Sequence, residues 1–173
     1  MTPTQLPATE ATLAIEPLSW DGIATVLAAV LAAIVAVLGY SIQQRIARKE
    51  RRAVIYSEAL RAVEDYLEAP YLVRRRDGST SARQTITTHI SEIQSRLSYY
   101  CALLDIHAHS EISTAYRTLV SAARAEGGKA MSQAWKSRPT RRDGGVPIGA
   151  RYNRSRSDDA RKGYIEAIRH RDA

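Results

Sequence analysis

The stretch GIATVLAAVLAAIVAVLGYSIQQ, residues 22–44, has no charged side chain and contains ten Ile, Leu or Val residues. As an α-helix it reaches about 34 Å, which is enough to span a hydrocarbon core of about 30 Å. Its branched aliphatic residues favour membrane insertion by about 3 to 6 kcal/mol. The stretch predicts one transmembrane helix over residues 20–44.

The charges beside this helix predict its orientation, because cytoplasmic flanks are rich in Lys and Arg. Trp20 and Tyr40 stand near the two ends, where amphipathic rings prefer the membrane interface. We therefore expect a single-pass protein of the cell membrane, with its N-terminus outside and its C-terminus in the cytoplasm. Five cations follow the helix and none precedes it, and we expect them to bind anionic lipid headgroups at about 1 kcal/mol each: Arg45, Arg48, Lys49, Arg51 and Arg52.

Residues 1–19 contain Pro3, Pro7 and Pro17 and show no helical or strand period, so we expect a flexible extracytoplasmic tail. A cleaved signal peptide is the alternative. Against it, the apolar run exceeds the usual length of about 7 to 15 residues, no cation precedes it and no A-x-A site follows.

Alanines recur every four residues along one face of the membrane helix, at Ala24, Ala28, Ala32 and Ala36. Small residues at this spacing let two membrane helices approach closely, which predicts a homodimer. The alternative is a chance register in an alanine-rich chain.

Helical periodicity continues beyond the membrane. Neither Pro nor Gly occurs between Tyr40 and Ala69, so we expect the membrane helix to continue and to end before Pro70. A second helix follows a Thr80 or Ser81 cap, and a third, capped by Ser110, ends before Gly127. Each of these helices carries an apolar stripe at spacings of 3 and 4: Ala53, Tyr56, Leu60, Val63 and Leu67; Ile86, Ile90, Ile93, Leu97, Tyr100 and Leu104; Ile112, Tyr116, Leu119 and Ala123.

The predicted fold is therefore all-α: a single transmembrane helix that continues into a cytoplasmic antiparallel bundle of three main helices over residues 45–137. A basic, irregular arm is expected over 138–157, where Pro and Gly are frequent. A short C-terminal helix is expected over 158–173, with Tyr164, Ile165 and Ile168 available to dock on the bundle.

The chain beyond Gln44 is strongly basic, with all 25 Lys and Arg against 15 acids, a formal charge of +10. Two arginine groups are candidates for binding a protein partner or an anion: Arg74, Arg75 and Arg76, and Arg138, Arg141 and Arg142. A straight helix would carry the first group about 37 Å from the bilayer, beyond several Debye lengths of about 8 Å. An anionic partner or a solvated turn therefore fits that group better than lipid.

The arm RPTRRDGGVPIGARYNRSR, residues 138–156, combines six arginines with Tyr152. Such a mixture can bind single-stranded nucleic acid through phosphates and stacking. A solvated arm that contacts a protein partner is the alternative, because no recognisable nucleic-acid-binding motif accompanies it.

No enzyme motif is present, so we expect no catalytic residue, metal or cofactor. His107 and His109 lie two residues apart and would face different sides of a helix, so metal binding by the pair is disfavoured. We expect His107 instead to cap the C-terminal end of the second helix, where a cation is favoured. Cys101 lies within a periodic helix and is expected to be a small core residue rather than a nucleophile.

Three stretches are distinctive: DYLEAPYLVRRRDG (65–78), HISEIQSRLSYY (89–100) and RPTRRDGGVPIG (138–149). With them, most of the chain after Trp20 resembles a family of single-pass membrane proteins of high-GC bacteria and their phages. The resemblance implies a membrane helix with a helical cytoplasmic domain, and it carries over no activity and no catalytic residues.

Together these patterns favour a membrane-anchored helical interaction or scaffold module that recruits a cytoplasmic protein. The alternatives are a membrane-tethered nucleic-acid-binding protein and a phage-type membrane effector, either holin-like or an exclusion protein.

Overall fold

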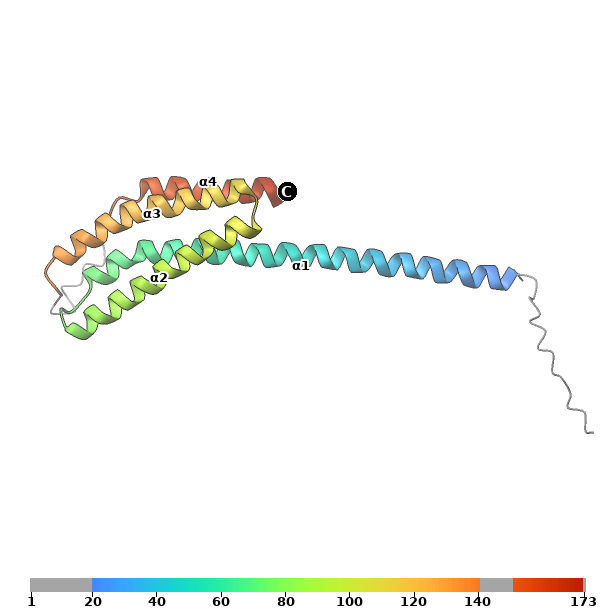
Figure 1. Cartoon of the computed structure of the whole chain (residues 1–173), viewed down its shortest axis with the longest axis horizontal. Coiled ribbons are helices and arrows are strands. Elements are labelled where there is room, and N and C mark those ends of the chain that lie inside the picture. Colours follow the sequence, from blue (N-terminus) through green and yellow to red (C-terminus); the bar gives the residue numbers. More distant parts are fainter. Residues whose placement is uncertain (1–19, 141–150, 173) are drawn as a thin grey trace, which may run out of the picture. The chain divides into compact units, whose positions relative to one another are not determined.

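The structure is a computed structural model that describes residues 20–140 and 151–172. These residues form four α-helices and no strand, which confirms the all-α prediction. The helices are α1 (Trp20–Arg74), α2 (Thr80–His107), α3 (Ser110–Lys136) and α4 (Ser155–Asp172) (Figure 1). The chain divides into two compact units after Arg48, and α1 contributes to both.

In the first unit, the described part of α1 exposes its apolar side chains. Large residues such as Leu27 and Val37 are 64% and 66% exposed. From Ile23 onward α1 is long and apolar enough to cross a membrane, and none of its most apolar 18-residue window is buried. Among the described residues it is the one helix with these properties.

The second unit has one apolar core to which all four helices contribute. The helical periodicity explains which residues belong to this core, because residues spaced by 3 and 4 share one face of a helix. In Figure 1 the last part of α1 and the helices α2, α3 and α4 lie alongside one another. Fully buried residues include Val63 and Leu67 of α1, Ile93 and Leu97 of α2, Ile112, Tyr116 and Leu119 of α3, and Tyr164 of α4.

Pro70 does not end the first helix, which corrects the prediction. α1 continues through Pro70 to Arg74. An internal proline costs about 3 kcal/mol, because it lacks an N–H and its ring crowds the carbonyls of the preceding turn. Tertiary contacts offset this cost: Ala69 and Val73 on either side are fully buried, and the Tyr152 hydroxyl donates a 2.6 Å hydrogen bond to the Leu67 carbonyl.

Gly127 and Gly128 do not end the third helix either, and α3 continues to Lys136. A Cβ built on Gly127 would lie 3.1 Å from Cε1 of Tyr66. Glycine at this position therefore lets α3 approach α1 closely. The part of α3 that follows is packed against the rest of the unit, since Ala130 and Ala134 are buried.

The predicted caps are each displaced by one or two residues. Ser79 is the N-cap of α2, and its hydroxyl accepts a hydrogen bond from the Ala82 N–H at 3.1 Å. His109 stands at the N-cap of α3, where we expected Ser110. The predicted break between the two helices is present, because α2 ends at His107.

The C-terminal helix begins earlier than predicted, at Ser155, so residues 155–157 belong to α4 and not to an irregular arm. It packs against the core, since Tyr164 is fully buried. Two predicted segments, the tail over 1–19 and the arm residues 141–150, lie outside the described residues.

Candidate anion-binding site

The five predicted membrane-surface cations all lie exposed along α1. Arg48 donates a 3.1 Å hydrogen bond to Gln44, whose amide in turn donates to the Tyr40 hydroxyl at 2.9 Å. These two hydrogen bonds link Arg48, Gln44 and Tyr40 along the surface of α1, in the direction of its apolar run. The four alanines of the predicted packing face are also exposed: Ala24, Ala28, Ala32 and Ala36.

The arginine triplet at the end of α1 separates into three environments. Arg74 lines a pocket. Arg75 is exposed, and its guanidinium lies 3.8 Å from the Glu68 carboxylate. Arg76 is only 8% exposed, so it does not contribute to the exposed anion-binding surface that we predicted.

Arg76 instead binds the C-terminal end of α3. Its guanidinium donates to the carbonyls of Ala134 at 2.8 Å, Trp135 at 2.9 Å and Ser137 at 2.6 Å. The last carbonyls of a helix lack intrahelical partners and carry partial negative charge, which favours a cation there. The guanidinium also lies 5.0 Å from the centroid of the Trp135 ring, within cation–π range.

The same contact brings Arg138 close to the end of α1 in space. The backbone N–H of Thr140 donates to the Arg76 carbonyl at 2.8 Å. Gly78, at φ +89°, lies against Pro139, where a Cβ would come within 2.9 Å of the proline ring. Arg75 and Arg138 are therefore exposed on neighbouring segments. Arg141 and Arg142 lie outside the described residues.

A pocket of about 490 Å³ opens where α1, α3 and the segment before α4 come together. Four cations line it: Arg74 at the end of α1, Lys129 of α3, Arg151 before α4 and Arg156 in its first turn. None of their side chains forms an ion pair with a carboxylate in the described part of the chain. The other described lining residues are Glu126 and five neutral residues: Ala125, Ala130, Gln133, Tyr152 and Asn153.

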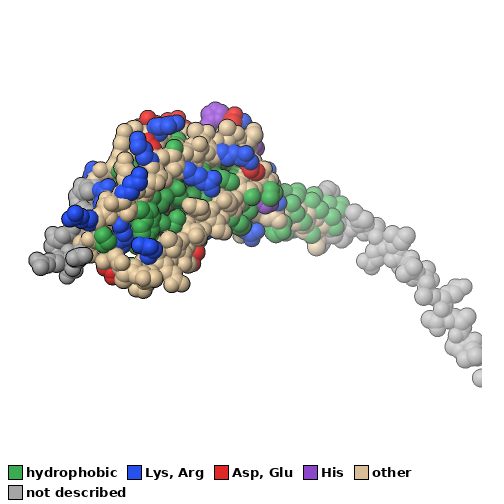
Figure 2. Space-filling view, turned by 60° about the vertical axis from the view of Figure 1, so that its left-hand side comes forward, with side chains coloured by type: hydrophobic (Ala, Val, Ile, Leu, Met, Phe, Trp, Pro, Cys, Tyr) green, Lys and Arg blue, Asp and Glu red, His purple; other side chains and the backbone are tan. Residues whose placement is uncertain are grey.

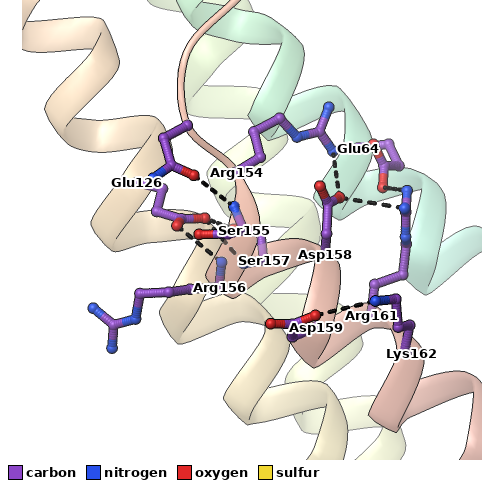
Figure 3. Close-up of polar contacts among 11 residues, drawn as sticks. Glu64, Glu126, Arg154, Ser155, Arg156, Ser157, Asp158, Asp159, Arg161 and Lys162 are labelled. Carbon is purple, nitrogen blue, oxygen red and sulfur yellow. Dashed lines mark hydrogen bonds and ion pairs between the residues drawn. The ribbon is translucent and has the colours of Figure 1, made fainter.

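Glu126 is directed at the start of α4, which contains one of these cations, Arg156 (Figure 3). The Arg156 guanidinium attracts the Glu126 carboxylate without forming an ion pair with it. One carboxylate oxygen accepts the backbone N–H of Arg156 at 3.1 Å, and the other accepts the N–H and hydroxyl of Ser157 at 2.9 and 2.5 Å. Burial raises the pKa of Glu126, but these hydrogen bonds outweigh burial and hold it below its usual value. The carboxylate therefore stays charged while three of its roughly four lone-pair sites accept hydrogen bonds.

A second polar network holds α4 against α1 (Figure 3). Glu64 of α1 accepts from Arg154 at 2.7 Å through one oxygen and from Arg161 at 3.2 Å through the other. Asp158 lies 3.2 Å from the other terminal nitrogen of Arg161. Arg154 therefore stabilises the fold through its ion pair with Glu64. Its neighbours in sequence, Arg151 and Arg156, line the pocket instead.

Figure 2 shows Lys and Arg side chains distributed around apolar surface on one face of the second unit. The Tyr152 ring does not lie free on such a surface, because it packs 5.4 Å from the Tyr71 ring. Its hydroxyl donates a hydrogen bond to the Leu67 carbonyl. Tyr152 therefore forms part of the pocket wall and does not offer an open ring face for stacking.

Other candidate residues have structural surroundings. His107 ends α2, and no group of three His, Cys, Asp or Glu within residues 20–140 and 151–172 could hold a metal. Cys101 is half-buried against the core. Burial raises the pKa of its thiol, which lowers the fraction of reactive thiolate.

Sequence reasoning missed Glu64, Glu126, Lys129 and the separate roles of Arg151 and Arg154. Local patterns contain no signal for them, because Glu64 and Arg154 are 90 positions apart. A weak signal existed at the start of α4, where Ser155, Ser157 and Asp158 are typical of a helix N-terminus.

Comparison of the chain with protein-family models, with curated proteins and with solved structures found no match.

Proposed function

We propose that this chain is a single-pass protein of the cell membrane whose antiparallel helical bundle lies in the cytoplasm and recruits a protein partner there. One observation supports it above all: α1 exposes an apolar run in its first unit and buries an apolar stripe in its second. The first part of this continuous helix is apolar on all sides, which suits a lipid environment. The later part is amphipathic, which suits packing against a protein core.

The exposed run is hard to reconcile with a water-soluble chain. Apolar surface costs about 25 cal/mol per Å² in water, and monomeric soluble proteins rarely expose contiguous apolar patches larger than a few hundred Å². A bilayer removes this cost. The cations from Arg45 to Arg52 then favour an orientation with the second unit in the cytoplasm.

Membrane topology is tested by cysteine labelling in a Cys101→Ser background. We expect a membrane-impermeant maleimide to label Thr4→Cys in intact spheroplasts. It should label Ser91→Cys, at an exposed position of α2, only after permeabilisation. The reverse pattern, or release of the protein by alkaline carbonate without detergent, would contradict the proposed anchor.

The proposed partner surface consists of Arg75 and Arg138, which are exposed on neighbouring segments of the second unit. Two unburied guanidiniums suit an acidic protein surface, since Arg pairs with carboxylates in a bidentate way. Charge reversal at both positions should abolish co-purification of a partner from detergent extracts. Reversal at Arg83 and Arg169, also exposed, should leave the recovered amount unchanged. Equal recovery with both double variants would exclude this surface.

A further inference from the structure

We propose that the pocket between α1, α3 and the start of α4 binds a small ligand with two or more phosphoryl groups. Arg74, Lys129, Arg151 and Arg156 line it. The inference does not depend on membrane anchoring or on a protein partner, because every residue of the site belongs to the second unit.

The first argument is charge. Four cations and one carboxylate among the described lining residues leave a net charge of +3 around the pocket. The cations come from three segments of the chain, and none of them forms an ion pair with a carboxylate in the described part of the protein, although Arg156 lies close enough to attract Glu126. Like charges held together repel one another, and a multivalent anion turns this repulsion into attraction.

The second argument is the position of Glu126. A carboxylate pointing into the pocket would neutralise part of the charge and exclude an anion. Instead, both of its oxygens accept hydrogen bonds from Arg156 and Ser157. The fold thus satisfies this acid mainly through backbone and hydroxyl donors at the start of α4. The carboxylate also attracts the nearby Arg156 guanidinium, whereas Arg74, Lys129 and Arg151 stay available to a ligand.

The third argument is geometry and size. A volume of about 490 Å³ lies within the range of about 300 to 1,000 Å³ that is usual for small-molecule sites. Three guanidiniums and one ammonium provide donors that suit phosphoryl oxygens, because the guanidinium fork binds two oxygens of one group. Gln133 and Asn153 add neutral amides to the lining. The Asn153 oxygen accepts the Ser155 N–H at 2.9 Å, so its NH₂ group remains as a donor.

A ligand in this pocket would connect the end of α1, the second half of α3 and the first turn of α4. The docked position of α4 is then favoured by the ligand, since any molecule that binds only the folded form stabilises it. Binding should therefore be visible as a rise of the thermal unfolding midpoint as well as by calorimetry.

The test is isothermal titration calorimetry of the full chain in a zwitterionic detergent, with inorganic tripolyphosphate as the probe. We expect saturable 1:1 binding that weakens with added NaCl. Lys129→Gln/Arg151→Gln should weaken it by roughly 100-fold, because each charge-assisted bond contributes about 1.5 to 3 kcal/mol and 1.4 kcal/mol is tenfold. Arg74→Gln alone should weaken it by roughly tenfold.

The matched control is Arg83→Gln/Arg169→Gln, which removes the same charge at exposed positions outside the pocket. It should retain the wild-type affinity within about twofold. Equal weakening in the control and pocket variants would overturn the proposal, and so would the absence of saturation at millimolar tripolyphosphate. Because Lys129 and Arg151 are both exposed, their replacement leaves the core intact.

A second arm separates a free ligand from a lipid headgroup. Soluble inositol trisphosphate and tripolyphosphate are compared with phosphatidylinositol bisphosphate in phosphatidylcholine nanodiscs. Competition of the soluble probes with one another, but not with the lipid, identifies a free ligand. Displacement of the soluble probes by the lipid identifies a headgroup. If neither arm shows binding that depends on the pocket residues, the site is excluded.

Discussion

The phenolic hydroxyl of Tyr164 donates a hydrogen bond to the backbone carbonyl of Tyr56 across 3.2 Å, which joins α4 to α1. The Tyr164 ring is fully buried and lies 5.4 Å from the ring of Tyr116 on α3. Burial raises the pKa of Tyr164, so its hydroxyl keeps the proton that it donates. One side chain thus connects three helices, and α4 is part of the core.

Tyr164→Ala should lower the free energy of unfolding by roughly 3 to 5 kcal/mol, because a large buried aromatic is lost. The thermal midpoint of the full chain in detergent would fall by about 2 to 4 °C per kcal/mol. Tyr99→Ala is the control, since Tyr99 is 59% exposed. A similar loss at both positions would show that α4 does not dock through Tyr164.

Two of the helical glycines, Gly127 and Gly163, should respond oppositely to replacement by valine. A side chain at Gly127 meets Tyr66 at 3.1 Å, whereas at Gly163 no atom lies within 4 Å. We expect Gly127→Val to destabilise by about 1 to 3 kcal/mol through overpacking. Gly163→Val should be neutral or stabilising by a few tenths of a kcal/mol, because glycine is the poorer helix former. Thermal unfolding of the two variants measures the difference, and equal midpoints would contradict the close approach of α1 and α3.

Arg76 should not be replaceable by lysine. Its planar fork reaches three carbonyls at the end of α3, and an ammonium cannot reproduce this geometry. Arg76→Lys and Arg76→Ala should each lower stability by roughly 2 to 4 kcal/mol. Arg75→Ala, which removes only an exposed ion pair, should change it by less than about 1 kcal/mol. Wild-type stability of Arg76→Lys would mean that charge alone suffices there.

Glu126 should make the stability of the protein fall in acid. Its pKa is lower in the folded chain than the ordinary value of 4.5. The stabilisation is therefore fully present above that ordinary value and is lost as the pH falls through the lower folded pKa. In thermal unfolding between pH 7 and pH 3, Glu126→Gln should be less stable than wild type at pH 7 and should lose less stability in acid. Parallel curves for the two proteins would rule out this contribution.

Some of the acid sensitivity should remain in Glu126→Gln. Hydrogen bonds from Arg117 and Arg171 also lower the pKa of Asp105 and Glu111, respectively. These two carboxylates are exposed, so their contribution should decrease with added salt. The acid response of Glu126→Gln should therefore become smaller at high ionic strength.

Much of the fold was predictable from local patterns. The apolar periodicity identified Ile93, Leu97, Ile112 and Tyr116 as core residues, and all four are buried. The break between α2 and α3 was also predicted, because the helical period is interrupted there. The candidate site was predictable only in part: Arg74 was chosen for the charge around it, and the other three cations of the pocket come from positions 55 to 82 residues further along the chain.

The sequence by itself determined the class of the protein: four helical segments, one of them with an uncharged apolar run, since periodicity and charge are local properties that need no partner. The tertiary structure alone decided that α1 continues through Pro70 and α3 through Gly127, because burial and close contact with Tyr66 offset the local signals to stop. It also decided which arginines are used in the fold. Arg76 and Arg154 find carbonyl and carboxylate partners far away in sequence, whereas Arg74 and Arg151 are left to line a pocket, and no local pattern distinguishes the two pairs.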